Sequence, residues 1–146
     1  MLLLMSEEKA KELGYTPYAR FVIAGNSALD PKIMGLGPVQ SSLDALKKAG
    51  LSIEDIDIWE CNEAFAVQNL GVIRGLEDAT GKKIDRECWN PNGGAISFGH
   101  ANGASGGRIA MSNMRELERR GGRYGLFTSC CGGGQGVSTI IENLRK

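Results

Sequence analysis

Hydrophobic and polar positions along this 146-residue chain alternate between two spacings, one typical of helices and one typical of strands. Apolar positions three and four residues apart predict a helix over residues 39–49, which Gly50 ends, and a largely buried helix over residues 64–76. Residues 109–120 predict a third helix, whose basic last turn suits the helix dipole. Three long helices are therefore expected.

Runs of apolar and β-branched residues predict strands over residues 18–24, 123–129 and 136–144. Residues 53–60 predict a turn followed by a strand, and a short strand is expected to begin at Cys88 and Trp89. Scattered glycines and prolines predict a loop over residues 25–38. Strands that alternate with helices indicate a layered α/β domain.

The beginning of the chain has an unusual pattern. Residues 2–5 are apolar and predict a buried strand, and Ser6 then predicts an N-cap for a short helix that ends at Gly14. Proteins seldom begin in the middle of a strand. We therefore expect Met1 to mark an internal start, a truncation or a cut between domains.

Composition excludes several functional classes. Hydrophobic residues make up 42% of the chain and charged residues 23%, which argues against disorder, and the 17 basic and 17 acidic residues cancel. The balance leaves no global positive field for nucleic acid or an anionic membrane, although a local basic patch could bind a phosphorylated ligand. Nothing in this sequence resembles a secretory signal, and no apolar stretch approaches about 20 residues. A cytoplasmic protein with free thiols is expected.

Glycine is the outlier of the composition, with 21 residues that cluster instead of spreading as a linker. The four cysteines lack the spacing of a zinc site and have one histidine among them, so no metal is expected. Three segments have residues suited to chemistry. The first is 61–66, where Asn62 could offer its amide to a water or a carbonyl; the alternative is an N-cap Asn62 with Glu63 in the first helical turn.

The second segment, residues 92–107, contains six glycines and the only histidine, His100. A lone histidine is commonly structural or merely exposed, but flanking glycines leave this imidazole accessible, and nearby Asn and Ser side chains could fix its tautomer. The helix after Ser105 has a free N-terminus.

The third segment is 129–136, where Cys130 and Cys131 precede three glycines. Two buried structural thiols are one interpretation. The other is that the glycine N–H groups form an oxyanion site and that Cys130 acts as an acid or base. A strand follows these glycines, so a dinucleotide-binding fingerprint is a poor match.

Together the three segments resemble the thiolase family, whose motifs stand here, in order, at residues 62–65, 90–108 and 130–136; residues 34–38 match a family segment near the acyl pocket. The resemblance covers nearly the whole chain. It implies a thiolase-like layered α/β domain, with a mixed β-sheet flanked by helices. It also implies that residues 1–17 are the last strand and helix of an N-terminal domain, and that residues 18–146 form the C-terminal domain.

The resemblance assigns roles to seven residues. His100 would activate a nucleophilic cysteine and form an oxyanion hole with a water held by Asn62. Cys130 would be the acid/base, and the Gly132 N–H would contribute to a second oxyanion hole. Ala64, Phe65 and Met34 would line the tunnel for pantetheine and the acyl group. The substrates would be acyl-CoA and CoA, with no further cofactor.

Departures from the family pattern concern specificity and completeness. Ala101 and Asn102 replace a Pro and an apolar residue, Pro91 and Cys131 replace apolar residues, and the loop at residues 78–87 is longer than in biosynthetic members that act on short acyl chains. The family's nucleophilic cysteine belongs to the N-terminal half, and nothing here resembles its motif. The chain is thus expected to need an N-terminal half, as a fragment or a subunit, within a homo- or hetero-oligomer. The alternative is a non-catalytic module that binds acyl-CoA or a partner.

Overall fold

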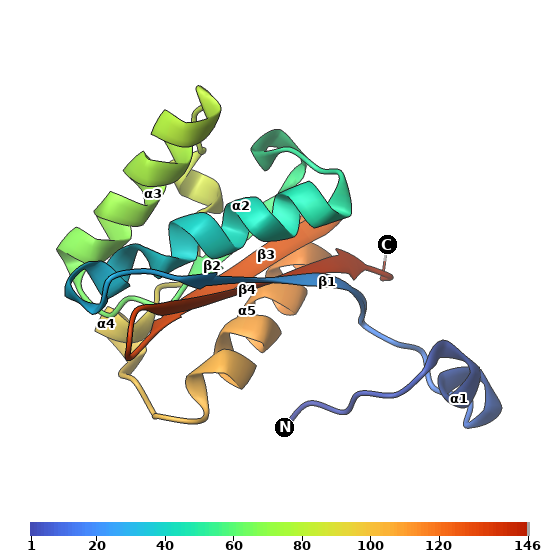
Figure 1. Ribbon diagram of the computed structural model, residues 1–146. Helices are drawn as coiled ribbons and strands as arrows, with labels where there is room; N and C mark the ends of the chain where they lie inside the picture. Colours follow the sequence, from blue (N-terminus) through green and yellow to red (C-terminus); the bar gives the residue numbers. More distant parts are fainter. Residues whose placement is uncertain (146) are drawn as a thin grey trace.

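Residues 1–145 of the computed structural model form a four-stranded sheet with helices on both faces (Figure 1). The strand order is β1-β4-β3-β2. Strand β4 is antiparallel to β1 and β3, and β2 is parallel to β3, so the sheet is mixed. The predicted α/β architecture with a mixed, helix-flanked sheet is confirmed. The strands are β1 (Ala19–Ala28), β2 (Ile58–Cys61), β3 (Tyr124–Cys131) and β4 (Gln135–Asn143).

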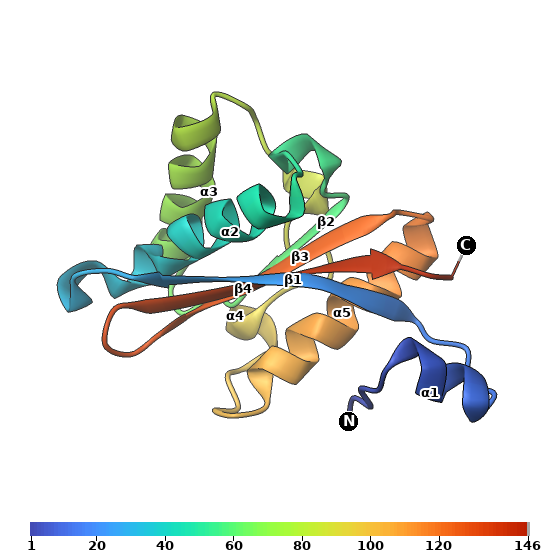
Figure 2. The same cartoon turned by 45° about the vertical axis from the view of Figure 1, so that its right-hand side comes forward.

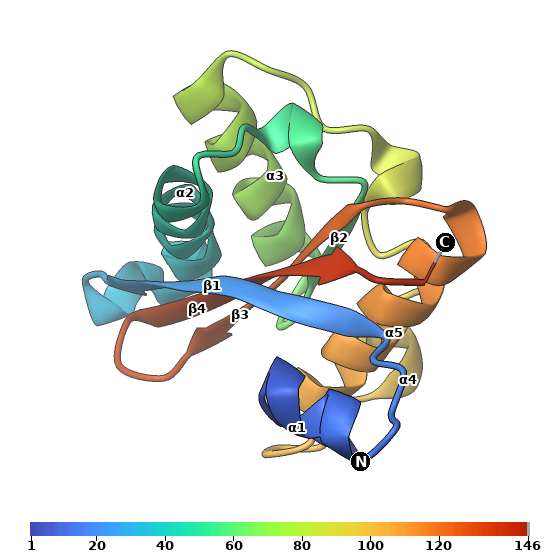
Figure 3. The ribbon, with the colours of Figure 1, turned by 90° about the vertical axis from the view of Figure 1, so that its right-hand side faces the viewer.

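Two long helices, α2 (Gly37–Ala49) and α3 (Ala66–Thr80), cover one face of the sheet, and α5 (Ser105–Arg120) covers the other (Figures 2 and 3). Each ends at a glycine in the left-handed conformation, as the sequence predicted at Gly50. The remaining elements are short: α1 (Glu7–Glu12), α4 (Ala95–Phe98), and the 3₁₀ helices η1 (Pro31–Leu36), η2 (Ile53–Asp55) and η3 (Arg86–Cys88).

Strand β2 is buried on both faces, which is typical of a strand in the parallel part of a sheet. The Trp59 ring stacks on Trp89 with centroids 5.6 Å apart, within the larger core cluster. Ile58 packs on the opposite face, with Leu117 of α5 and Ile141 of β4. Burying each such side chain contributes roughly 2 kcal/mol, so both faces anchor β2.

Helix α2 lies unusually close to the sheet. A Cβ atom on Gly25 would lie 2.1 Å from the Ser41 carbonyl oxygen, so only glycine permits this approach. In the gap, Ser41 and Ser42 each hydrogen-bond the Ser138 hydroxyl, at 2.7 and 3.0 Å, and Ser138 donates to Thr128. These bonds satisfy buried hydroxyls that would otherwise cost stability. They also tie α2 to β3 and β4, the two strands joined by the glycine turn of residues 132–134.

Five of the predicted elements differ in the structure. Residues 2–5 do not form a buried strand, because no strand pairs with them; Leu3 and Leu4 are exposed. Cys88 ends η3, and Trp89 makes only an isolated bridge to Trp59. Within the predicted loop at residues 25–38, β1 continues to Ala28 and η1 and α2 begin, because β4 pairs with the whole of β1. Helix α3 begins two residues later than predicted and α5 four residues earlier.

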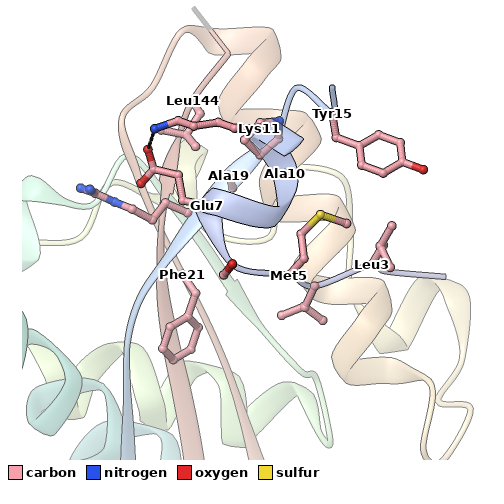
Figure 4. Close-up of a pocket in the computed structure, with 13 residues that line it drawn as sticks. Leu3, Met5, Glu7, Ala10, Lys11, Tyr15, Ala19, Phe21 and Leu144 are labelled. Carbon is pink, nitrogen blue, oxygen red and sulfur yellow. Dashed lines mark ion pairs between the residues drawn. The ribbon is translucent and has the colours of Figure 1, made fainter. Parts of the chain in front are cut away.

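The N-terminal segment, which includes α1, does not join the sheet but lies beside β1 (Figure 3). Between them lies a pocket of about 450 Å³, lined by apolar side chains that include Leu3, Met5, Phe21 and Leu144 (Figure 4). Lys11 forms an ion pair with Glu7 at its rim. In residues 1–145, no helix has the length and apolar character needed to cross a membrane.

Candidate functional site

Asn62 and Cys130 lie at the same edge of the sheet, the edge formed by the C-terminal ends of the parallel strands β2 and β3. Strands β2 and β3 are parallel, and Cys61 pairs with Thr128. The Asn62 backbone N–H continues this ladder by donating to the Thr128 carbonyl oxygen at 2.9 Å. Asn62 therefore follows the end of β2 beside a residue only two positions before Cys130.

The Asn62 side chain is not a helix cap. Helix α3 begins at Ala66, its N-cap position is Phe65, and no side chain caps it, so the capping interpretation of Asn62 and Glu63 is wrong. Asn62 is only 3% exposed, and its Oδ1 atom has no hydrogen-bond partner among residues 1–145. A buried amide with unmet hydrogen-bonding capacity is suited to holding a water or a ligand.

Glu63 has a role that the sequence analysis missed. Its carboxylate accepts hydrogen bonds from the Asn90 side-chain amide and from the Ile96 backbone N–H, both at 3.0 Å. A Cβ atom on Gly94 would lie 2.4 Å from the carboxyl carbon of Glu63, so any side chain here would displace the carboxylate from this position. Glu63 thus ties the end of β2 to α4. Its partners lie 27 and 33 positions away, so the local sequence gives no sign of them.

His100 lies in the loop between α4 and α5 and is exposed, as the flanking glycines predicted. Its Nδ1 atom is 2.7 Å from the Ser105 hydroxyl oxygen. Ser105 is buried at the first position of α5, and its hydroxyl also contacts the Ala101 carbonyl oxygen at 3.2 Å. The structure thus places one of the expected serine side chains within hydrogen-bonding distance of the imidazole.

Cys130 lies near the end of β3, opposite Gly136 of β4, and is half-buried. Burial raises the pKa of its thiol, so the thiol form is favoured at neutral pH. Residues 132–134 make the turn into β4. Gly132 is exposed there, and Gly134 has a φ of 86° with no room for a side chain against the Leu29 carbonyl oxygen. The turn and the His100 loop lie at one end of the sheet (Figures 1 and 2).

Cys61 is fully buried, and burial strongly raises the pKa of its thiol; the neighbouring Cys130 adds to this shift. Its Sγ atom lies 3.7 Å from the Asn62 carbonyl oxygen. A buried thiol that stays protonated is a poor nucleophile. Cys61 therefore has a structural role beside the candidate site.

The residues predicted to contact substrate lie around the start of α3. Phe65 is 68% exposed, Ala64 and Met34 are partly buried, and Gln68 donates a hydrogen bond to the Gly35 carbonyl oxygen at 2.9 Å. That bond holds η1, which contains Met34, against α3. Exposed apolar side chains of η1 and of the start of α3, among them Leu36, Phe65 and Val67, are open to a ligand or to another chain.

The structure groups the predicted residues without joining their side chains directly. Asn62 and Cys130 share a sheet edge, and Glu63 links that edge to the helix preceding His100. None of the seven residues lines the N-terminal pocket of Figure 4. Within residues 1–145, no group of three or more His, Cys, Asp or Glu side chains could hold a metal ion.

Comparison with known proteins gives consistent matches. The family model for the thiolase C-terminal domain matches residues 15–143. The chain is 48% identical over 143 residues to the 3-oxoadipyl-CoA/3-oxo-5,6-dehydrosuberyl-CoA thiolase of Escherichia coli (strain K12), covering 98% of this chain and 35% of that protein. It is 47% identical over 142 residues to the human mitochondrial 3-ketoacyl-CoA thiolase, covering 97% and 34%.

Solved structures agree in fold. The acetyl-CoA acetyltransferase of Bacillus anthracis superposes with a TM-score of 0.89 at 46% identity, covering 96% of this chain and 34% of that one. Human mitochondrial 3-ketoacyl-CoA thiolase in complex with CoA gives a TM-score of 0.85 at 47% identity, covering 94% and 33%. The chain thus spans about a third of the length of these relatives.

Proposed function

We propose that this chain, which belongs to the thiolase family and corresponds to its C-terminal domain, supplies the acid/base and oxyanion-stabilising groups for CoA-dependent acyl transfer. The reaction is thiolysis of a 3-ketoacyl-CoA or its reverse, the Claisen condensation of two acyl-CoA molecules. The nucleophilic cysteine comes from an N-terminal half, as part of one polypeptide or as a separate subunit. Residues 1–17 belong structurally with that half, and residues 18–146 form the C-terminal domain.

One observation carries the proposal: the Asn62 N–H bonds the Thr128 carbonyl oxygen, which places Asn62 and Cys130 at one sheet edge. Condensation needs a base to remove a proton from the α-carbon of a thioester, and donors to stabilise the resulting oxyanion. Cys130 takes that proton, and in thiolysis it returns the proton to the departing carbanion. The Gly132 N–H, together with His100 and the water held by Asn62, stabilises charge on the thioester oxygens.

The resting protonation of Cys130 suits its part in thiolysis. Burial raises the pKa of the thiol, so at neutral pH the group has a proton to donate. In condensation the Cys130 thiol must first lose this proton, because only the thiolate can act as the base. Each well-placed oxyanion donor supplies about 3 kcal/mol of transition-state stabilisation in other enzymes. No organic cofactor is needed for proton transfer of this kind.

Acyl-CoA and CoA are the proposed ligands. The exposed Phe65 and the partly buried Met34 and Ala64 are suited to contact pantetheine and an acyl chain, and a relative 47% identical to this chain was solved in complex with CoA. The proposal includes an oligomer, in which the N-terminal half or further copies of this chain pack against its exposed apolar side chains. Four free thiols fit a reducing compartment such as the cytoplasm.

Complementation tests the proposal. The chain would be mixed with the N-terminal part of the Escherichia coli thiolase that it does not match, and acetoacetyl-CoA consumption would be followed with CoA present. We expect no turnover from either part alone and turnover from the mixture. In the mixture, Cys130→Ala and His100→Ala should lower kcat by roughly 10²- to 10⁴-fold, whereas Cys88→Ser should leave it unchanged. Robust turnover by the chain alone would contradict the split role.

The binding alternative has its own outcome in the same experiment. Titration of the isolated chain with CoA measures whether it binds the ligand without the other half. Tight CoA binding, no association with the N-terminal part and no turnover would favour a non-catalytic acyl-CoA-binding module.

A further inference from the structure

A carboxylate and a guanidinium lie buried between β2 and α5, outside the groups assigned above. Glu60 is only 1% exposed and stands two residues before Asn62. The Ser112 hydroxyl of α5 donates to its Oε1 atom at 2.7 Å, while Oε2 has no partner in the described part of the chain. A buried carboxylate oxygen left unpaired is costly, so we expect Glu60 Oε2 to have a partner.

Arg108 offers the complementary groups. Its Nε and Nη2 atoms are buried and lack acceptors among residues 1–145. Arg108 lies four residues before Ser112 on α5, so the two side chains share a helix face, and Ser112 touches Glu60. The guanidinium is near enough for its charge to favour the ionised carboxylate, although the two groups form no direct ion pair. A bridging water or a side-chain rearrangement would join them.

The charges around Glu60 agree with this pairing. Burial is the main influence and raises the pKa of Glu60 to about 7, while the Ser112 hydrogen bond and Arg108 act to lower it. Glu63 at the end of β2 and Glu116 on α5 are the like charges that face it and raise it further. Arg108 is thus the cation that favours the ionised form of Glu60.

Arg108 contacts both ends of the His100 loop, one through its side chain and the other through its backbone. Its guanidinium lies over the Phe98 ring, 5.5 Å from the centroid, and Phe98 is the last residue of α4. Its backbone N–H donates to the Ala104 carbonyl oxygen at 3.0 Å, where α5 begins. Residues 99–104 run between these two attachments. The loop is otherwise held from the β2 side through Glu63 and Ile96.

We propose that Glu60 and Arg108 are positioning residues: the buried carboxylate on β2 holds the guanidinium, and the guanidinium, packed on Phe98, fixes the α4 end of the loop that presents His100. Asn62 and His100 are then held in register because their supports, Glu60 and Arg108, pair with each other. The inference rests on the proposed function only where it calls His100 a site residue. The coupling of Glu60 and Arg108 to the His100 loop is a property of this chain alone and can be measured without the other half.

Amide hydrogen exchange at Ala104 and Ser105, whose N–H groups both bond the Ala101 carbonyl oxygen, reports opening of this loop. In the isolated chain, Glu60→Gln and Arg108→Met should each speed exchange at these amides roughly tenfold. Because the residues act as one unit, the double variant should exchange no faster than the faster single variant. The single histidine gives one set of imidazole ¹⁵N signals, which should show a mixture of tautomers in both variants.

Arg115→Met and Glu118→Gln are the matched controls, since this 3.2 Å ion pair lies on the same helix and is exposed. They should leave exchange at Ala104 and Ser105 within about twofold of wild type. If Arg108→Met does not fold, Arg108→Lys tests the same point, because lysine keeps the charge but lacks the planar fork. Unchanged exchange in Glu60→Gln, or effects that multiply in the double variant, would overturn the proposal.

The complemented enzyme gives a separate readout. If the proposed function is right, Glu60→Gln should lower kcat for acetoacetyl-CoA thiolysis several-fold and leave KM for CoA unchanged, as expected for a misplaced histidine. If wild-type chain gives no turnover with the N-terminal part, the proposed function fails. The exchange and ¹⁵N results still decide the positioning role in that case.

Discussion

The Nδ1 atom of His100 lies 2.7 Å from the hydroxyl oxygen of Ser105, and this contact determines which imidazole nitrogen is free. Ser105 has one hydroxyl proton, and the Ala101 carbonyl oxygen at 3.2 Å is an acceptor for it. The serine oxygen then accepts a hydrogen bond from Nδ1–H. Nε2 is left with an unshared pair, which is the form of histidine that can take a proton from a nucleophile.

Ser105→Ala should therefore change the tautomer of His100. Without the acceptor at Nδ1, the proton should move in part to Nε2, which imidazole ¹⁵N chemical shifts measure directly. In the complemented enzyme we expect kcat to fall roughly tenfold, the lower end of the effect of removing a group that orients a histidine. Ser97→Ala, an exposed serine in the same glycine-rich segment, is the control. An unchanged tautomer in Ser105→Ala would contradict the assignment.

Glu63→Gln should weaken the link between β2 and α4. The glutamine side chain has one acceptor oxygen, whereas the carboxylate accepts from both Asn90 and Ile96. One donor would face the new NH₂ group and lose its partner, at a cost of about 1–3 kcal/mol. Urea unfolding measures this loss. A free energy of unfolding within about 0.5 kcal/mol of wild type would show that the bonds to Glu63 are dispensable.

Gly94→Ala tests the same contact from the other side. The new methyl group would lie 2.4 Å from the Glu63 carboxyl carbon, so the carboxylate must move and give up its hydrogen bonds. We expect a loss of about 2 kcal/mol or more. Gly106→Ala is the matched control, because that helical glycine faces open space and alanine favours helix by about 1 kcal/mol. In combination with Glu63→Gln, the cost of Gly94→Ala should shrink.

Stability should depend on pH through Glu60. Burial raises its pKa from 4.5 to about 7, so the folded state binds this proton more tightly than the unfolded state does. The contribution is fully present below about pH 4.5 and is lost as pH rises through 7; it amounts to at most about 3 kcal/mol. Glu60→Gln should flatten the decline in unfolding free energy between pH 5 and 8, measured with urea. If the unfolding free energies of wild type and variant changed in parallel with pH, Glu60 would not be the source of the pH dependence.

Alkylation by iodoacetamide should distinguish the thiols. Burial raises the pKa of both Cys61 and Cys130, and Cys61 is also inaccessible. In the folded chain, mass spectrometry should find Cys61 unmodified until urea is added. Modification of half-buried Cys130 should be slow at pH 7 and faster towards pH 9, because the thiolate is the reactive form. Rapid labelling of Cys61 under native conditions would contradict the buried role.

Local patterns predicted the long helices and the strands correctly where one face of the element is buried and a glycine ends it, as in α2 with Gly50. They placed the start of α3 too early, because Phe65 precedes that helix without a polar cap. They also predicted a strand at residues 2–5. A strand needs a partner, and apolar character alone does not provide one.

The candidate site was predictable to the extent that its motifs are contiguous. His100, Cys130 and Asn62 each belong to a recognisable segment, and the Ser105 contact follows from a spacing of five residues. The supports of the site were not predictable in the same way. Glu63 bonds Ile96 over 33 positions, and Ser112 bonds Glu60 over 52 positions, so only the folded chain reveals them.

The parallel pairing of β2 with β3 has a consequence for how this domain tolerates change. Register fixes Asn62 beside Thr128 through backbone hydrogen bonds alone, whatever the length of the chain that connects the two strands. Residues added directly after Gly81, at the opposite end of α3 from Asn62, should leave the spacing of Asn62 and Cys130 unchanged. Ile84 is the exception in this connection, because it is buried and its N–H donates to Glu77. Evolution or an engineer can thus remodel the outer loops of the domain while its chemistry stays in place.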